Sequence, residues 1–232
     1  IIFGSERMRV AFFTLGCKVN QYESNSVACL LSEAGYDVVH HTESDLDVVI
    51  INSCTVTAES DRKTRQTVRR FKKSHPSAAV VLMGCMAQAV KEKGDRLTDA
   101  DIVTGNTDHS KIPELLDEYF KNRQRLVFIA PHEKGERYNT PPISDFSERT
   151  RAYIKIEDGC DRFCSYCIIP FARGRVRSRD LKDIKTEATA LKNKGFSELV
   201  LTGINLSAYG KDNGLCLADA VKAVAECGIK RV

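Results

Sequence analysis

Short apolar runs alternate with amphipathic stretches between residues 9 and 129, and this alternation constrains the fold more than any other feature. The stretch Val27–Ala34 has the i, i+3, i+4, i+7 spacing of an amphipathic helix, which Gly35 would end, and a further helix is expected around Ile112–Lys121. The runs expected to be strands are Arg9–Phe13, Val48–Asn52, Ala79–Met83, Ile102–Thr104 and Leu126–Ile129. Strands that alternate with helices in this way predict an α/β fold with an open, mostly parallel sheet.

Three cysteines of this region share one position, because each lies just beyond the carboxyl end of an expected strand. They are Cys17, Cys54 and Cys85. The carboxyl ends of parallel strands lie along one edge of a sheet, where ligands of open α/β folds bind. Taken singly, each cysteine could equally be a small buried residue. The repeated placement predicts a shared site at which three thiolates could hold an iron–sulfur cluster.

A second set of three cysteines falls within eight residues, at spacings of four and three: Cys160, Cys164 and Cys167. Thiolates this close on one loop can converge on a single soft metal centre. A structural zinc site would need a fourth ligand, and the chain has no histidine after His132. The spacing therefore favours a cubane of four irons, one of which has no protein ligand, over a zinc site.

Two arginine-rich stretches are candidates for contact with a phosphate backbone. The stretch from Arg62 to Lys73 contains seven basic residues and no acidic one, and it includes Arg65 and Arg69. Further along, arginines recur at every second position from 173 to 179. In an extended chain the side chains of Arg173, Arg175 and Arg177 would project from one side, where they could bind an anionic polymer or carboxylates.

Residues 130–148 contain prolines and scattered charges without an apolar period, so we expect a linker between residues 9–129 and a second domain, residues 149–232. In the second domain, strands are expected at Ala152–Ile156 and Glu198–Leu201, with a helix capped by Asp180 between them. A helix around Leu217–Val224 and an opening third strand follow. This β/α series stops within an element, so we expect the chain to be a fragment.

Composition narrows the class of protein further. The chain has 232 residues, a net charge of +4 and nine cysteines. An odd number of cysteines without a secretory signal favours a reducing, cytoplasmic compartment and metal ligation over disulfides. The longest apolar run, Ala78–Met83, is too short to span a bilayer, so no membrane association is expected. Residues 1–8 are expected to be a tag or an N-terminal extension, with Met8 as the natural start.

The two halves together resemble a known family. The CxxxCxxC run with Tyr166 before its last cysteine resembles the signature of radical S-adenosylmethionine (SAM) enzymes. Leu15-Gly16-Cys17-Lys18-Val19-Asn20-Gln21, Asn52-Ser53-Cys54 and Gly84-Cys85 resemble the N-terminal domain of the methylthiotransferases, and Cys160 to Arg179 resembles their radical SAM domain. This resemblance implies a Rossmann- or flavodoxin-like sheet followed by the start of a radical SAM partial β/α barrel. In this family the rest of that partial barrel and a small RNA-binding β-barrel domain would follow, so the resemblance implies that the chain is truncated.

The resemblance also implies the cofactors and their ligands. Cys160, Cys164 and Cys167 would hold the 4Fe–4S cluster that cleaves SAM, and Cys17, Cys54 and Cys85 would hold an auxiliary 4Fe–4S cluster that carries the sulfur to be transferred. One SAM would supply a methyl group and another a deoxyadenosyl radical, while an external flavodoxin- or ferredoxin-like protein would donate electrons. Gly203 and Asn205 stand where the superfamily contacts SAM, and Tyr166 would lie near its adenine. No catalytic residue is expected beyond the cluster ligands.

Within the family, the run Gly-Cys-Lys-Val-Asn-Gln is most similar to the branch that acts on N6-threonylcarbamoyladenosine beside the tRNA anticodon. The expected substrate is therefore tRNA, with carbon 2 of that adenine as the target. Methylthiotransferases of isopentenyladenosine in tRNA, or of a ribosomal protein, are the alternatives within the family. Outside it, a non-catalytic iron–sulfur electron carrier and a zinc-bound RNA-binding module remain open.

Overall fold

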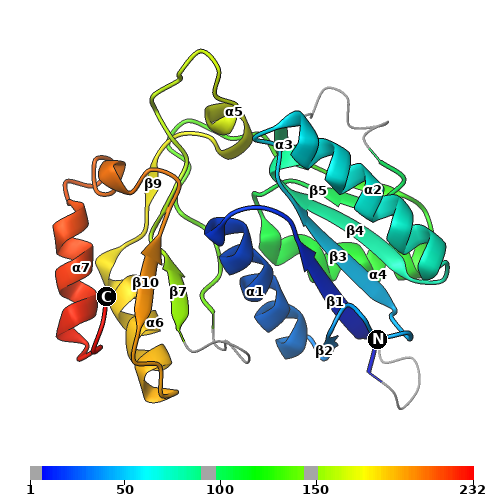
Figure 1. Cartoon of the computed structure of the whole chain (residues 1–232), viewed down its shortest axis with the longest axis horizontal. Coiled ribbons are helices and arrows are strands. Elements are labelled where there is room, and N and C mark those ends of the chain that lie inside the picture. Colours follow the sequence, from blue (N-terminus) through cyan, green and yellow to red (C-terminus); the bar gives the residue numbers. More distant parts are fainter. Residues whose placement is uncertain (1–6, 90–97, 144–150) are drawn as a thin grey trace. The chain divides into compact units, whose positions relative to one another are not determined.

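The computed structural model describes residues 7–89, 98–143 and 151–232 (Figure 1). The chain divides into two compact units, Ile1–Pro131 and His132–Val232, which we call the first and second units. Most of the expected N-terminal extension, residues 144–148 of the expected linker and residues 149–150 of the expected second domain lie outside the described residues. No helix in the part of the chain that the structure describes combines the length and the apolar character needed to cross a membrane.

The first unit is built on a parallel six-stranded sheet. Its strand order is β2-β1-β3-β4-β5-β6. The strands are β1 (Arg9–Thr14), β2 (Asp37–Val39), β3 (Val48–Ser53), β4 (Ala79–Gly84), β5 (Ile102–Thr104) and β6 (Leu126–Phe128). Every strand pair in this sheet is parallel, with Phe12 opposite Ile50 and Ile50 opposite Val81. The order resembles that of flavodoxin-like folds, whose ligand crevice lies where the direction of winding reverses. Here that reversal falls between β1 and β3.

Helices cover both faces of this sheet. They are α1 (Lys18–Glu33), α2 (Ala58–Ser74), α3 (Cys85–Ala89), the 3-10 turn η2 (His109–Lys111) and α4 (Ile112–Asn122). Successive side chains of a strand point to opposite faces, so Ile50 packs in the core under α1 and α4, and Ile51 packs in the core under α2 and α3. Strands β3 and β4 are buried along their whole length. This is why their sequences are continuously apolar rather than alternating.

The expected strands of the first unit and the helix around Ile112–Lys121 are confirmed to within a residue or two. The helix expected at Val27–Ala34 ends as predicted but begins nine residues earlier, at Lys18, because its first half buries polar side chains and has no apolar period. Strand β2 was not expected, because its three residues, Asp37–Val39, are largely exposed at the edge of the sheet and have little apolar signal. Helix α3 was also missed, since its five residues are too few to show a helical period. The open parallel α/β sheet that the sequence predicts is confirmed.

The second unit begins a second β/α series. Strands β7 (Ala152–Lys155) and β10 (Leu199–Thr202) are parallel neighbours, joined through α6 (Leu181–Asn193), and α7 (Leu217–Glu226) follows the 3-10 turn η3 (Leu206–Ala208). A short antiparallel pair, β8 (Glu157–Asp158) with β9 (Arg177–Ser178), and the helix α5 (Ile169–Arg173) lie between β7 and α6. Arg231 forms a parallel bridge with Glu198, as expected of an opening third strand.

Two local expectations in this unit need correction or comment. Asp180 occupies the N-cap position of α6, but its side chain accepts no capping hydrogen bond, so the expected cap is wrong. Residues 132–143 contain neither helix nor strand, yet they belong to the second unit and pack against the rest of it. The hydroxyl of Tyr138 donates to the carbonyl of Lys155 at 2.9 Å, and the ammonium of Lys155 donates to Thr140 at 3.0 Å. A linking role for residues 130–148 stays a prediction.

Candidate metal centres

The three cysteines of the first unit follow three adjacent strands of its sheet. Cys17 lies three residues after β1, at the N-cap of α1, Cys54 directly follows β3, and Cys85 follows β4 as the first residue of α3. Cys54 and Cys85 are buried and Cys17 is exposed. All three thus sit along the carboxyl edge of the sheet, around the point where its winding reverses. The structure therefore brings these segments to the edge that the sequence predicts.

Buried amide side chains connect the ends of β1 and β3. The amide nitrogen of Asn20, in the first turn of α1, donates to Asn52 Oδ1 at 2.8 Å and to the Ser53 carbonyl at 2.9 Å. In return, the amide nitrogen of Asn52 donates to the Asn20 carbonyl at 2.9 Å. Both side chains are almost fully buried. Because an unpaired buried amide is costly, this reciprocal pairing holds the segments that carry Cys17 and Cys54 in register.

A serine connects the ends of β3 and β4 in the same way. The Ser53 hydroxyl donates to the carbonyl of Met83 at 2.7 Å and accepts the backbone N–H of Met86 at 3.1 Å. Gly84 between these residues has a φ of 98°, and a Cβ there would run into the amide oxygen of Asn52. It would also lie 2.7 Å from the backbone oxygen of Ser53. The segment that carries Cys85 is therefore held tightly against the end of β3.

Sequence reasoning missed the roles of Asn20, Asn52 and Ser53. Each lies within four residues of a candidate ligand, in motifs that the family resemblance already quoted. Polar residues next to a cysteine at the end of an apolar strand were the available signal.

The second set of cysteines lies on a loop of the second unit whose base is tightly held. The backbone N–H of Cys160 donates to the carbonyl of Gly174 at 3.0 Å, and that of Cys167 donates to the carbonyl of Cys164 at 2.9 Å. Gly159 has a φ of 82°, and a Cβ there would overlap the backbone oxygen of Arg175. Phe163 adopts a φ of 44°, a strained value for a bulky residue. The chain thus turns sharply between the ligands, as close thiolates on one loop require.

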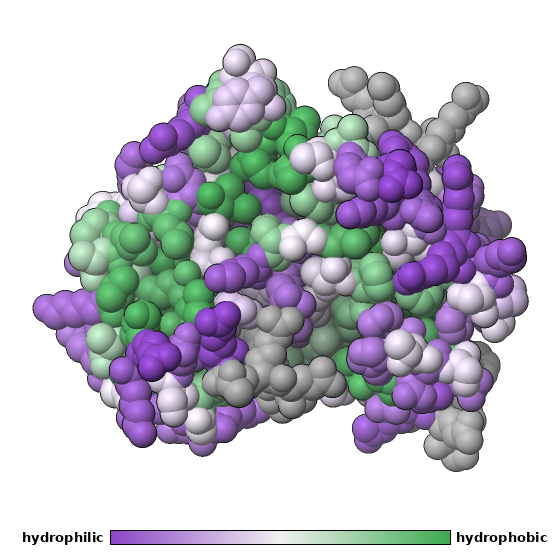
Figure 2. All heavy atoms as spheres, in the orientation of Figure 1, coloured by the Kyte–Doolittle hydropathy of each residue, from purple (hydrophilic) through white to green (hydrophobic). Residues whose placement is uncertain are grey.

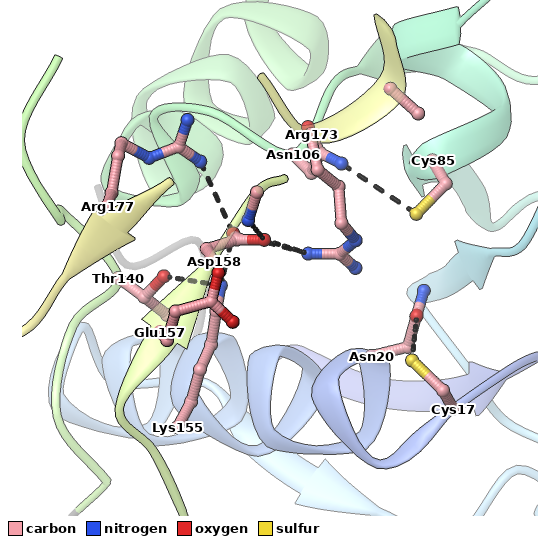
Figure 3. Close-up of polar contacts among 12 residues, drawn as sticks. Cys17, Asn20, Cys85, Asn106, Thr140, Lys155, Glu157, Asp158, Arg173 and Arg177 are labelled. Carbon is pink, nitrogen blue, oxygen red and sulfur yellow. Dashed lines mark hydrogen bonds and ion pairs between the residues drawn. The ribbon is translucent and has the colours of Figure 1, made fainter. Parts of the chain in front are cut away.

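A buried group of charges lies beneath this loop (Figure 3). The carboxylate of Asp158 is 2.6 Å from the Lys155 ammonium, 3.1 Å from the Arg173 guanidinium and 3.4 Å from that of Arg177. All four side chains are at most 4% exposed. Burial alone would raise the pKa of Asp158, but the three cations outweigh burial and hold that pKa well below its usual range. Asp158 is therefore an anion that all three buried cations share, and Arg177 also pairs with Glu136 at 3.2 Å.

This arrangement corrects the expectation of a one-sided arginine surface. Arg173 ends helix α5 rather than lying in an extended run, and only Arg177–Ser178 forms a strand. Arg173 and Arg177 are buried against Asp158, so their assignment as substrate contacts is wrong in this structure. Arg175 remains exposed, 3.4 Å from Asp161 and over the ring of Phe163. Sequence alternation alone did not show which side of the run faces the interior.

Of the residues expected to contact SAM, Gly203 and Asn205 are partly exposed and lie against the buried Glu157, whereas Tyr166 lies at the surface. The backbone N–H of Asn205 donates to Glu157 Oε2 at 2.7 Å. Gly203 leaves room for this carboxylate, since a Cβ there would lie 2.7 Å from the same oxygen. Burial raises the pKa of Glu157 to about 7, against the opposing effect of the Asn205 N–H. Tyr166, in contrast, is 89% exposed. Sequence analysis did not single out Glu157, although it lies three residues before Cys160.

The basic helix α2 presents a hydrophilic surface, which Figure 2 shows as a gathering of polar side chains where this helix lies. Arg65 and Arg69 are both exposed, and Arg69 has one distant ionic partner, Asp99, at 3.8 Å. The guanidinium of Arg70 instead lies over the rings of Phe13 and Phe71 and so contributes to packing. The exposed candidates on this helix are therefore Arg65 and Arg69.

The two sets of three cysteine thiols suit an iron–sulfur cluster better than a single metal ion. Within residues 7–89, 98–143 and 151–232, no three His, Cys, Asp or Glu side chains already form a ready-made metal site. The segments of the first set nevertheless meet, because a Cβ added at Gly16 would lie 3.0 Å from the Cβ of Cys54. Three thiolates in each set match a cubane cluster that keeps one iron without a protein ligand.

Comparisons with known proteins show what the chain as a whole is similar to. Residues 9–105 match the model of a family described as "Uncharacterized protein family UPF0004". The chain is 40% identical over 212 residues to the threonylcarbamoyladenosine tRNA methylthiotransferase MtaB of Aquifex aeolicus, covering 89% of this chain and 50% of that protein. It is 41% identical to the Bacillus subtilis protein of the same name, covering 88% and 45%. The chain thus spans about half the length of these curated relatives.

More distant matches extend the comparison. The chain is 31% identical to a tRNA-2-methylthio-N(6)-dimethylallyladenosine synthase of Staphylococcus haemolyticus, covering 94% of this chain and 44% of that protein. Among solved structures, the radical S-adenosylmethionine methyltransferase TsrM from Kitasatospora setae matches with a TM-score of 0.58 at 15% identity. That match covers 95% of this chain and 51% of TsrM. At this identity it supports the fold, including the start of a β/α series after the parallel sheet.

Proposed function

Because this chain belongs to the methylthiotransferase family, we propose that it is part of a radical SAM enzyme that acts on tRNA. The enzyme inserts sulfur at carbon 2 of N6-threonylcarbamoyladenosine beside the anticodon and methylates that sulfur. The observation that carries the proposal is two separate sets of three thiols in a chain 40–41% identical to two proteins named for this reaction. The identity to the dimethylallyladenosine enzyme, 31%, is lower, which favours the threonylcarbamoyl substrate.

The two sets of cysteines have different roles in this proposal. Cys160, Cys164 and Cys167 hold the 4Fe–4S cluster that binds SAM, and Cys17, Cys54 and Cys85 hold an auxiliary 4Fe–4S cluster. When bound, the clusters supply the electron that cleaves SAM and the sulfur that is transferred. The protein's own contribution is to hold the thiols on tightly packed turns and to keep the first set at a sheet edge where ligands gather.

The remaining site residues bind the organic partners. The corner formed by Gly203 and Asn205 lies beside Cys160, where SAM would bind, and exposed Tyr166 on the same loop is available to its adenine. Arg65, Arg69 and Arg175 are the exposed candidates for tRNA phosphates. A flavodoxin- or ferredoxin-like protein donates the electron from outside.

Single replacements in the full-length enzyme test this division. Cutting the carbon–sulfur bond of SAM requires only the second cysteine set, whereas sulfur insertion also requires the first. Cys54→Ala should therefore spare the reductive cleavage of SAM to deoxyadenosine and abolish the methylthio product on tRNA. Cys164→Ala should abolish both. Mass spectrometry of deoxyadenosine and of digested tRNA nucleosides from one reaction measures both products.

Three outcomes of this assay would contradict the proposal. Normal methylthiolation by the Cys54→Ala enzyme would remove the sulfur-donor assignment. A methylthio group found on dimethylallyladenosine rather than on threonylcarbamoyladenosine would identify the other substrate. Cluster-loaded enzyme that cleaves no SAM on reduction would point to an electron carrier.

A further inference from the structure

Two asparagines, one in each unit, occupy the same local arrangement. Asn106 follows strand β5 in the run Thr104-Gly105-Asn106, and Asn205 follows strand β10 in the run Thr202-Gly203-Ile204-Asn205. Each therefore lies just past the carboxyl end of a parallel strand, beside the strand that leads into a candidate cysteine. The similarity is local to each unit and arises from unrelated parts of the sequence.

The backbone of each asparagine is held by a side chain close in sequence to that cysteine. The N–H of Asn106 donates to Gln88 Oε1 at 3.2 Å, and Gln88 lies three residues after Cys85. The N–H of Asn205 donates to Glu157 Oε2 at 2.7 Å, and Glu157 lies three residues before Cys160.

A glycine precedes each asparagine by one or two residues, and it leaves room for the accepting side chain in both cases. A Cβ at Gly105 would overlap Gln88 Oε1, and a Cβ at Gly203 would lie 2.7 Å from Glu157 Oε2. Each glycine thus lets the accepting side chain approach the backbone closely.

The side chain of each asparagine points its amide nitrogen at a cysteine sulfur. Asn205 Nδ2 lies 3.6 Å from Cys160 Sγ, and Asn106 Nδ2 lies 3.8 Å from Cys85 Sγ (Figure 3 shows the second pair). These distances suit donation to sulfur, which is larger than oxygen. The Ser207 hydroxyl donates to Asn205 Oδ1 at 2.8 Å, which fixes the amide with its nitrogen toward Cys160.

We propose that Asn106 and Asn205 are positioning residues that donate N–H···S hydrogen bonds to ligand sulfurs and thereby raise the reduction potentials of the two clusters. The inference rests on the proposed function, because it assigns Cys85 and Cys160 as cluster ligands. On one-electron reduction by an external donor no bond forms or breaks, but negative charge on the ligand sulfurs increases. A donor aimed at a sulfur therefore stabilises the reduced cluster more than the oxidised one.

The test for Asn205 uses full-length protein with Cys17, Cys54 and Cys85 replaced by alanine, so that one cluster remains. Asn205→Leu keeps the volume and removes the donor. Its cluster should retain four irons, and its midpoint potential should be more negative than that of the parent, as followed by electron paramagnetic resonance during a redox titration. The ratio of reduced to oxidised cluster at a fixed potential should fall several-fold, up to about tenfold, which corresponds to ~59 mV.

Matched variants separate this effect from a general disturbance. Asn213→Leu makes the same change at an exposed position of the same unit and should leave the potential unchanged. Ser207→Ala frees the orientation of the Asn205 amide and should produce a smaller shift in the same direction. If Asn205→Leu fails to hold iron, Ser207→Ala decides the question, because it leaves Asn205 in place.

The corresponding test for Asn106 replaces Cys160, Cys164 and Cys167 by alanine and compares Asn106→Leu with Asn122→Leu, an exposed position of the same unit. Only Asn106→Leu should lower the potential of the remaining cluster. Variants that hold four irons with unchanged potentials would overturn the inference and leave the proposed function intact. Parent proteins that hold no cluster at all would instead overturn the assignment of the ligands, and the inference with it.

Discussion

At the scale of single residues, one carboxylate determines whether the base of the second cysteine loop can be buried. Asp158 faces Lys155, Arg173 and Arg177, and all of these side chains are almost entirely removed from water. It also accepts the backbone N–H of Gly159 at 2.8 Å, directly before Cys160. Glu136 pairs with Arg177 as well, at 3.2 Å, but without Asp158 the repulsion among the three cations would increase in a poorly solvated interior. The carboxylate therefore links the buried cations to the backbone that positions Cys160.

Replacing Asp158 should be strongly destabilising. Asp158→Asn removes the buried carboxylate that Lys155, Arg173 and Arg177 share, although Arg177 keeps Glu136 at 3.2 Å. We expect the free energy of unfolding to fall by ~3–5 kcal/mol, as measured by urea denaturation. Asp161→Asn is the matched control, because Asp161 and its partner Arg175 are both at least half exposed, and its effect should stay below ~1 kcal/mol. Equal effects of the two replacements would show that the buried cations rearrange or lose their protons at little cost.

The lowered pKa of Asp158 also predicts how the stability of the protein depends on pH. Folding lowers the pKa of Asp158, so its contribution is fully present above the ordinary pKa of an aspartate and is lost as the pH falls toward the lower folded value. Urea denaturation as a function of pH should therefore show a loss of stability below about pH 4 that Asp158→Asn reduces. An unchanged acid profile in the variant would contradict this account.

Gly84 gives a second prediction at this scale. Gly84 and Gly35 both have positive φ values, 98° and 93°, but only at Gly84 would a new Cβ meet Asn52 and Ser53, since nothing lies within 4 Å at Gly35. Gly35→Ala should cost about 1–2 kcal/mol from the backbone alone. Gly84→Ala should cost clearly more and should also reduce the iron bound by the first cysteine set. Thermal unfolding and iron analysis measure both effects, and equal losses at the two glycines would argue against the close packing of β3 and β4.

At the scale of elements, helix α2 has an apolar side that packs in the core and a basic side that faces outward. Val68 and Phe71 face the core beneath it, while Arg65 and Arg69 face outward. Arg62 is paired with Glu59 at 2.7 Å and Lys72 with Asp101 at 2.8 Å, so the charge available to a partner is smaller than the sequence suggests. The two outward arginines remain the cations of this helix on which a prediction of RNA contact can rest.

Reversing the charge of Arg65 and Arg69 to glutamate should weaken tRNA binding. It should also flatten the dependence of log affinity on log salt by about one for each phosphate contact that is lost. Arg70 should be left in place, because it packs on Phe13 and Phe71. The control reverses Lys111, at the N-cap of α4, and Lys121, in the last turn of α4. This helix covers the opposite face of the sheet, and the two reversals change the net charge equally. Filter binding at several salt concentrations measures the slope. An identical slope in both double variants would show that α2 makes no phosphate contact and is an ordinary solvated surface.

At the scale of the whole molecule, the two cysteine sets belong to two separately packed units. The first set depends on hydrogen bonds among Asn20, Asn52 and Ser53, and the second on contacts of Gly159, Cys160 and Gly174. Each set is thus positioned by its own unit, and neither group of contacts includes a residue of the other unit. Each cysteine set should therefore bind its cluster independently of the other set.

Anaerobic reconstitution of the full-length protein should therefore yield two 4Fe–4S clusters, and replacing Cys160, Cys164 and Cys167 by alanine should leave one. Counting iron and acid-labile sulfide per chain measures this directly. Loss of all the iron from the triple variant would show that the first set does not bind a cluster by itself. A colourless, zinc-containing protein would favour the alternative of a zinc-bound module.

The sequence by itself determined the strand and helix pattern, the parallel sheet, and the placement of Cys17, Cys54 and Cys85 at its carboxyl edge. These features follow from local periodicity and from the rule that parallel strands end together, so neighbouring residues carry the information. The spacing of Cys160, Cys164 and Cys167 is equally local. Strand β2 escaped prediction because it has only three residues, two of them exposed, which are too few to show a local period.

Only the tertiary structure decided which polar side chains are buried and which sulfur or ion each one faces. The arginine run at 173–179 is regular in sequence, yet Arg173 and Arg177 turn inward because Asp158 lies beneath them, and Arg175 stays exposed. Likewise, Asn205 lies 45 residues from Cys160 in the chain, and Asn106 lies 21 from Cys85. An amide acquires its partner only when separate segments pack together, and no local pattern encodes that distance.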